Sequence, residues 1–218
     1  MKVIDLTHTF DEDMPSYPGD PKATLEQVAF IDKDTYNDHK ITTVMHVGTH
    51  IDAPLHMIAG GKRIDEIGPE KLIGEGILID VRGKEKIDAN VLDNIQIEEG
   101  SILLLFTGFG SKFKSKDYFK GYPELTEDFA NKIVKLKVKI VGMDMLGPDY
   151  DKPWKTHKIL LGNGIMILEN LTNLDQLLSV DKFEVFALPP KFKSDAAPVR
   201  VIAIIGLQHS LHFAKASR

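Results

Sequence analysis

The feature that most constrains this chain of 218 residues is the segment from Met45 to His56, which reads MHVGTHIDAPLH. It holds His46, His50, Asp52 and His56, although the whole chain has only eight histidines. Imidazole and carboxylate are ligands that a divalent cation such as Zn²⁺ accepts, and three protein ligands leave a coordination position for water. The segment therefore predicts the first half of a catalytic metal site, and the fold must bring these side chains together.

The residues around the histidines argue against a helix. A β-branched run, 41–44, precedes them, and Gly48 and Pro54 interrupt the segment. Glycine and proline are poor residues for a helix interior, and β-branched residues favour strands. We therefore expect a strand over about 40–47 that opens into a loop bent by Gly48 and Pro54, with the backbone close to the metal at Gly48.

This segment resembles the signature H-x-G-T-H-x-D-A-P-x-H of the cyclase-like metal-dependent hydrolases, a family that includes bacterial kynurenine formamidases. The resemblance extends over most of the chain. The stretch 14–21, MPSYPGDP, the stretch 157–171, HKILLGNGIMILENL, and the stretch 196–205, AAPVRVIAII, are similar to further patterns of the family.

The resemblance implies a role for each matching residue. His46, His50 and Asp52 would hold one metal ion, and His56 would act as a general acid/base. A second ion would share Asp52 and take His157 and Glu169. The implied cofactor is one or two divalent ions per subunit, with zinc favoured and manganese as the alternative. The implied activity is hydrolysis of an amide such as N-formylkynurenine, a step of tryptophan catabolism.

General chemistry supports this interpretation. Two cations bridged by one carboxylate can polarise a carbonyl together, and a metal lowers the pKa of bound water from 15.7 to about 7. The chain has no cysteine and no G-x-S-x-G motif, so the common designs with a nucleophilic side chain have no support. A histidine can then carry a proton to the leaving nitrogen. This chemistry suits hydrolysis of a formamide or another amide, a lactam or an ester. Together with the resemblance, it predicts a hydrolase that uses metal-activated water to cleave a C–N bond of a small amide, aromatic or not.

Other interpretations are open for each residue and for the function. His46, His50 and Asp52 could form a structural metal clip, His56 could cap a turn in a loop, and Glu169 could be a surface residue at a strand end. The chain could instead be a ring-opening hydrolase or a cyclase acting on a lactam or lactone. It could also be a metal-dependent binding protein without turnover, which would not need His56 as a proton carrier.

The composition fits a soluble enzyme built as one domain over residues 1–218. A net charge of −5 argues against a nucleic-acid partner. No apolar stretch reaches the eighteen residues that a membrane-spanning helix needs, and the N-terminus does not resemble a signal peptide, so we expect no membrane partner and a cytoplasmic location. The expected partners are a small-molecule substrate and further copies of the chain, in a homodimer or homotetramer, as the family resemblance implies.

Strand-like and helical runs alternate along the chain. Strands are expected at 3–6, 40–47, 76–80, 101–107, 138–143, 164–168, 183–188 and 199–205, and helices at 87–94, 126–137 and 174–178. The segment 109–123 is expected to be a loop or a broken helix. This mixture predicts an α/β protein, and the family resemblance implies a swivelling β/β/α domain in which a mixed sheet forms a barrel-like core with short flanking helices.

Four further sites lie outside the main motif. The turn 17–21 is expected to wall the substrate pocket, and Asp144 is expected at the pocket edge because it follows a strand. His8 is expected to be structural. Gln208 and His209 follow the last strand and are expected to support the metal site from behind.

Overall fold

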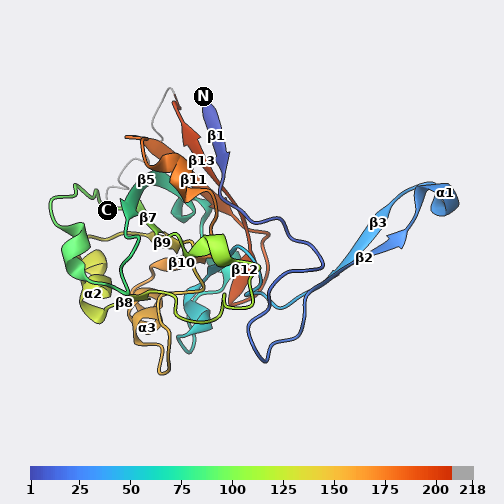
Figure 1. Ribbon diagram of the computed structural model, residues 1–218, viewed down its shortest axis with the longest axis horizontal. Helices are drawn as coiled ribbons and strands as arrows, with labels where there is room; N and C mark the ends of the chain where they lie inside the picture. Colours follow the sequence, from blue (N-terminus) through green and yellow to red (C-terminus); the bar gives the residue numbers. More distant parts are fainter. Residues whose placement is uncertain (208–218) are drawn as a thin grey trace.

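The computed structural model describes residues 1–207; the expectation for Gln208 and His209 lies outside the described residues. Its main feature is a nine-stranded mixed sheet in the order β1-β13-β11-β5-β7-β9-β10-β4-β12 (Figure 1). These strands are β1 (Lys2–Asp5), β4 (His50–Asp52), β5 (Ile73–Asp80), β7 (Ile102–Phe106), β9 (Ile140–Met143), β10 (Met166–Glu169), β11 (Phe183–Leu188), β12 (Ala196–Pro198) and β13 (Arg200–Ile205).

The centre of the sheet is parallel and buried on both faces. β5, β7, β9 and β10 run parallel to one another, and all five residues of β7 are buried. Successive side chains of a strand point to opposite faces. Accordingly Leu103 and Leu105 belong to one hydrophobic cluster, whereas Ile102 and Leu104 belong to another. A continuous apolar run such as 102–106 is what a parallel strand covered on both faces requires.

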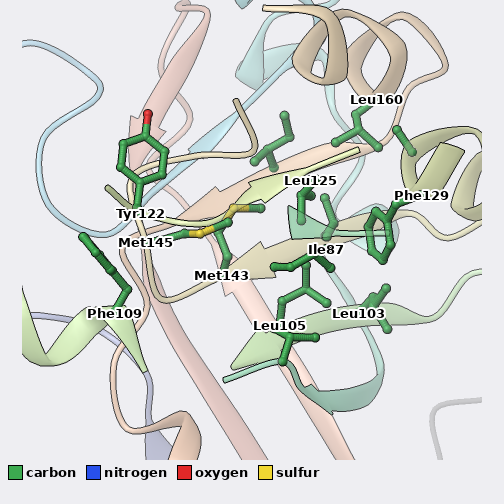
Figure 2. Close-up of a cluster of buried hydrophobic side chains, with 14 of the residues drawn as sticks. Ile87, Leu103, Leu105, Phe109, Tyr122, Leu125, Phe129, Met143, Met145 and Leu160 are labelled. Carbon is green, nitrogen blue, oxygen red and sulfur yellow. The ribbon is translucent and has the colours of Figure 1, made fainter. Parts of the chain in front are cut away.

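The first cluster lies between the sheet and two helices. α2 (Glu127–Lys135) is capped by Thr126, whose side chain accepts a hydrogen bond from the Phe129 backbone N–H. Phe129 and Leu160, the latter from α3 (Lys155–Gly162), pack with Leu103 and Leu105, as Figure 2 shows. α2 and α3 therefore shield one face of the sheet from water.

The second cluster shows that the sheet curls. Ile4 of β1, Val185 of β11 and Val201 of β13 share a cluster with Leu104 of β7 and Leu168 of β10. Thr7, just after β1, also forms a bridge with Leu171, just after β10, so this edge of the sheet closes toward its centre. The predicted α/β fold, a mixed sheet with a barrel-like core and short flanking helices, is confirmed, and the sheet is open, with β1 and β12 at its edges.

Several predicted elements differ from the structure. The expected helix 87–94 is wrong: the chain forms β6 (Lys86–Ile87), paired with β8 (Glu124–Leu125), and a 3₁₀ turn at Ala89–Leu92 that the Asp88 side chain caps. The expected helix 174–178 is a 3₁₀ turn at Leu174–Leu177. Further 3₁₀ turns lie at Pro54–His56, Ile64–Glu66, Pro69–Lys71 and Phe109–Lys112.

The expected strand 40–47 is also wrong beyond Thr42. Of the β-branched run 41–44, only Ile41 and Thr42 belong to a strand, β3 (Asp38–Thr42), which pairs with β2 (Thr24–Ala29) in a separate two-stranded sheet. With the short helix α1 (Ile31–Asp34) at its tip, this hairpin extends away from the rest of the molecule (Figure 1). The chain then turns back through residues 43–49 and enters the main sheet at His50.

No helix in the part of the chain that the structure describes is long and apolar enough to cross a membrane.

Candidate metal centre and active site

Three of the predicted site residues lie on paired strands. His50 of β4 faces Glu169 of β10 across the antiparallel ladder, and Asp52 follows His50 by two residues. Residues directly opposite in such a ladder point to the same face, as do residues two apart on one strand. Sheet register alone therefore brings His50, Asp52 and Glu169 together. We refer to these three residues as the deep set.

The deep set is buried and incompletely satisfied. His50 and Asp52 have side chains that are 1% exposed, and Glu169 is 8% exposed. His50 Nε2 lies 3.2 Å from Glu169 Oε2 and 3.5 Å from Asp52 Oδ1. Nevertheless His50 Nε2, both carboxylate oxygens of Asp52 and Glu169 Oε1 have no hydrogen-bond partner among the described residues. Buried polar atoms are rarely left unpaired, so these four atoms fit the donor set of a divalent cation.

The loop before β4 orients His50. His50 Nδ1 donates to the backbone carbonyl of Gly48 at 2.8 Å, which leaves Nε2 directed at the two carboxylates. Gly48 has a φ of +68°, and a Cβ there would meet the methyl carbon of Met14. Glycine adopts this left-handed conformation without strain, whereas a residue with a side chain would be strained there. A histidine whose other nitrogen is held by a carbonyl is the arrangement usual for metal ligands.

A second group of residues lies nearer the surface. His46 comes from the loop before β4, His56 from the 3₁₀ turn after it, and Asp195 from the segment just before β12. Asp195 Oδ2 lies 2.9 Å from His46 Nε2 and 3.2 Å from His56 Nδ1. The three side chains are 25%, 24% and 37% exposed, in the order His46, His56, Asp195. We refer to these three residues as the shallow set.

The two sets meet at Asp52. His46 Nδ1 lies 3.0 Å from Asp52 Oδ1. Ligand atoms of His46, Asp52 and His56 lie close enough to share one cation, and so do those of His50, Asp52 and Glu169. The sequence-based prediction places Asp52 between two ions, which fits both groups. However, that prediction assigns His50 and Glu169 to different ions and assigns His56 to neither ion. How the ligands are divided between the two ions therefore remains a prediction.

His157 enters the site from α3, a helix that the sequence analysis did not predict. Its Nε2 lies 3.3 Å from Glu169 Oε1, and its Nδ1 bonds to Asp149 Oδ2 at 2.7 Å. Asp149 also accepts hydrogen bonds from the backbone N–H groups of Thr156 and His157, at the start of the helix. Although its surroundings in sequence are polar, His157 is buried, with 7% of the residue exposed. A carboxylate behind a histidine is again typical of metal sites.

The charges of the site shift its pKa values. Burial lowers the pKa of His46, but Asp195 and Asp52 outweigh it and raise this pKa to about 10. Burial likewise opposes the ion pairs of His157, whose pKa nevertheless rises to about 9 because of Asp149 and Glu169. Burial raises the pKa of Asp52, but the histidines around it, His46 foremost, hold the pKa below its usual value. Without a cation, protons on the histidines neutralise the carboxylates.

A cavity of about 390 Å³ opens above these residues. It is lined by His46, Asp52, His56, His157, Glu169 and Asp195 together with Tyr17, Asp20, Met57, Tyr122, Leu146, Gly147, Asp149 and Trp154. The expectation that the turn 17–21 walls the pocket is therefore confirmed for Tyr17 and Asp20. Asp144 does not line the cavity; it is buried and accepts hydrogen bonds from Thr107 and from the Gly108 backbone N–H. His8 stacks on Phe113 with ring centroids 3.7 Å apart, which agrees with a structural role.

Sequence reasoning missed two residues of the site, Asp195 and Asp149. Each is an aspartate in a loop, without a histidine at metal-ligand spacing beside it. The contact of Asp195 with His56 joins positions 139 residues apart, so only the fold reveals it. Asp149 accepts from the backbone N–H groups of Thr156 and His157, seven and eight residues further on, which is outside the spacing of a helix N-cap, so no local pattern marks it either.

A family model and known proteins of similar sequence relate this chain to one family. The family model named Cyclase, described as a putative cyclase, matches residues 4–150. A kynurenine formamidase of Bacillus cereus is 32% identical over 204 residues, covering 91% of this chain and 95% of that protein. A kynurenine formamidase of Bacillus mycoides matches with the same identity and coverage.

Solved structures of similar fold support the same relationship. A structure described as a potential metal-dependent hydrolase with cyclase activity has a TM-score of 0.77 at 29% identity, covering 93% of this chain and 96% of that chain. Isatin hydrolase A from Labrenzia aggregata, bound to benzyl benzoate, has a TM-score of 0.84 at 26% identity, covering 94% of this chain and 93% of that chain. The predicted enzyme class, a metal-dependent hydrolase, is confirmed, and the donor set agrees with a divalent cation. The chain belongs to the cyclase family of metal-dependent hydrolases.

Proposed function

We propose that this protein hydrolyses the C–N bond of a small aromatic amide, with zinc, or alternatively manganese, held at the floor of the cavity. The observation that carries the proposal is the convergence of buried ligand atoms of His50, Asp52 and Glu169, without hydrogen-bond partners among the described residues, beneath a cavity lined by three aromatic side chains. Cavities of this volume fit small-molecule ligands.

Five side chains would hold the cation or cations. His46, His50, Asp52, His157 and Glu169 offer imidazole nitrogens and carboxylate oxygens, and Asp52 is common to both ligand groups. Gly147 leaves room beside them, since a Cβ there would lie 2.6 Å from Glu169 Oε1. When bound, a divalent cation supplies Lewis acidity toward the substrate carbonyl and lowers the pKa of water to about 7.

His56 is placed to move the proton that amide cleavage requires. Asp195 holds its Nδ1 at 3.2 Å, so Nε2 is the nitrogen left to face a substrate. The leaving nitrogen of an amide must be protonated before it departs, and a histidine held by a carboxylate can deliver this proton. Asp195 fixes the ring and also contacts His46, so it connects the proton donor to the metal ligands.

The cavity wall indicates the kind of substrate. Tyr17, Tyr122 and Trp154 present flat apolar surfaces, whereas the described lining residues include no lysine or arginine. Asp20 and Asp195 would repel a substrate carboxylate. N-formylkynurenine, suggested by the formamidase relatives, would have to place its carboxylate outside this wall. A neutral cyclic amide such as isatin, suggested by the isatin hydrolase neighbour, is the second candidate.

A substrate panel tests the proposal. Metal-loaded protein should be assayed with N-formylkynurenine, a neutral aryl formamide, isatin and an aliphatic formamide of similar size. We expect kcat/KM to be highest for the aromatic amides, because the three aromatic side chains bind rings. Turnover of none of them by protein with stoichiometric metal would contradict the proposal and favour a binding protein. A Trp154→Leu variant is the matched control, and it should lose the preference for aromatic over aliphatic amides.

A further inference from the structure

Asn170 follows Glu169 directly and ties the end of β10 to the loop before β4. Its side-chain Nδ2 donates to the Gly48 carbonyl at 3.0 Å, and its backbone carbonyl accepts from Thr49 Oγ1 at 2.6 Å. Asn170 therefore holds both of these loop residues, one through its side chain and the other through its backbone. The proposed reaction gives Asn170 no task, although it is a buried polar residue, 7% exposed, beside a metal ligand.

The Gly48 carbonyl is the acceptor on which His50 depends. It accepts from His50 Nδ1 at 2.8 Å and from Asn170 Nδ2, so both of its lone pairs are used. Glycine adopts several backbone conformations at little cost, so the peptide after Gly48 is free to rotate unless its carbonyl is held. The bond from Asn170 opposes that rotation. It thereby keeps a proton on His50 Nδ1 and leaves Nε2 as the nitrogen that can bind a metal ion.

Tyr118 fixes the side chain of Asn170 in the required orientation. A carbonyl can only accept, so the Asn170 amide must turn its Nδ2 toward Gly48 and its Oδ1 away. Tyr118 is 1% exposed, and its hydroxyl donates to that Oδ1. Without this donor the amide would have a buried oxygen unpaired. The ring of Tyr118 is held in turn by Phe113 and Phe119, whose ring centroids lie 5.2 and 5.7 Å away.

A small cavity next to these residues shows what the hydrogen bonds exclude. It measures about 30 Å³, and His50, Tyr118 and Asn170 are among the residues that line it. This is room for about one or two water molecules. Water that bonded to the Gly48 carbonyl would compete with His50 for it. The bonds from Tyr118 and Asn170 satisfy the buried groups without water and so favour one orientation of the His50 ring.

We propose that Asn170 and Tyr118 are positioning residues, which hold the Gly48 carbonyl so that His50 keeps its place as a metal ligand. The proposal rests on the proposed metal site and deepens it, because it assigns part of the strength of metal binding to residues outside the ligand set. It also gives a task to the aromatic segment 109–123, which carries Tyr118.

Zinc affinity tests the proposal, measured on metal-free protein by competition with a chromophoric chelator. Tyr118→Phe removes only the hydroxyl, and Asn170→Gly removes the amide without straining the backbone, because the φ of Asn170 is +56°. We expect each variant to raise the zinc dissociation constant about 10–100-fold, as for other groups that support metal ligands. The double variant should bind zinc no more weakly than Asn170→Gly, because Tyr118 acts only through Asn170.

The His50 ring supplies a second readout, which a general loss of stability would not move selectively. In zinc-loaded wild-type protein the Nδ1 proton of His50 should give an NMR signal that exchanges slowly with water, because it is buried and bonded to Gly48. Tyr118→Phe should speed this exchange. The Nδ1 proton of His157, which Asp149 accepts, should exchange as in wild type.

Ser101→Ala is the matched control. Ser101 is 2% exposed, and its hydroxyl donates to the Glu98 carbonyl, away from the ligand set. Tyr118→Phe and Ser101→Ala each remove one buried hydroxyl, so both should lower the Tm of metal-free protein, but Ser101→Ala should keep the wild-type zinc affinity.

Wild-type zinc affinity in Tyr118→Phe would overturn the proposal, as would additive losses in the double variant. If Asn170→Gly does not fold, Tyr118→Phe and the His50 signal still decide the question. A substrate panel without turnover would contradict the proposed function alone, since zinc binding is measured without a substrate.

Discussion

The deep set and the shallow set of the site are built differently. His50, Asp52 and Glu169 lie on paired strands inside the sheet and are almost fully buried. His46, His56 and Asp195 lie on loops and a 3₁₀ turn and are about a quarter to a third exposed. Sheet register fixes ligand atoms rigidly, whereas loops expose groups to substrate and solvent. We therefore expect the deep set to hold the metal, with His46 as a further ligand at its edge, and we expect His56, which Asp195 positions, to transfer the proton.

The largest effect is expected from the deep set. Asp52→Asn removes the charge of the carboxylate that both ligand groups share. We expect almost no bound metal and a loss of activity of more than about 10⁴-fold, beyond the range for a lost general acid/base. Elemental analysis and kcat/KM measure both effects. Asp175→Asn, an exposed site, is the control, and full metal content in Asp52→Asn would contradict the division into two sets.

The next effect is expected from His56. His56→Ala should retain its metal and lose activity by about 10²–10⁴-fold, mainly in kcat, because the leaving nitrogen loses its proton donor. The loss should be smaller for an ester with a good leaving group, which departs without protonation. If His56→Ala loses its metal, His56 is a ligand, as its closeness to His46 and Asp52 would allow. If neither metal nor rate changes, His56 is only a loop residue.

A smaller effect is expected from Asp195, which orients His56 and His46. Asp195→Asn keeps the shape of the side chain but removes its charge. We expect a loss of about 10–100-fold, as for other groups that support metal ligands. The loss should appear mainly in kcat, because Asp195 holds the His56 ring in place for proton transfer. Unchanged kcat and KM would show that Asp195 has only a structural role.

Sequence alone predicted the fold class and the residue types of the site, for identifiable reasons. The motif from His46 to His56 is local, and the apolar runs of the central strands are long enough to recognise. His50 and Glu169 face each other because two strands distant in the sequence pair in one particular register. No local sequence pattern encodes that register. Asp195 was missed for the same reason, because it contacts His56 only through the fold. Helix α3 could have been found, because His157, Leu160 and Leu161 have the spacing of one helix face.

The smallest effect concerns pH and protein freed of metal by a chelator. The pKa of His46 rises to about 10 and that of His157 to about 9, from 6.5 when unfolded. A raised histidine pKa stabilises the fold fully below pH 6.5, and this stabilisation is lost as pH rises through 9 to 10. The Tm of the metal-free protein should therefore fall over this range. Metal-loaded protein should lack this decline, and equal declines in both forms would contradict the assignment of these histidines as ligands.

Anomalous diffraction from crystals of metal-loaded protein tests the central claim most directly. The account predicts an ion about 2.0–2.2 Å from His50 Nε2 and from carboxylate oxygens of Asp52 and Glu169. It also predicts that His56 remains on Asp195 and does not bind the ion. An ion held by His56, with no density between His50 and Glu169, would contradict the account.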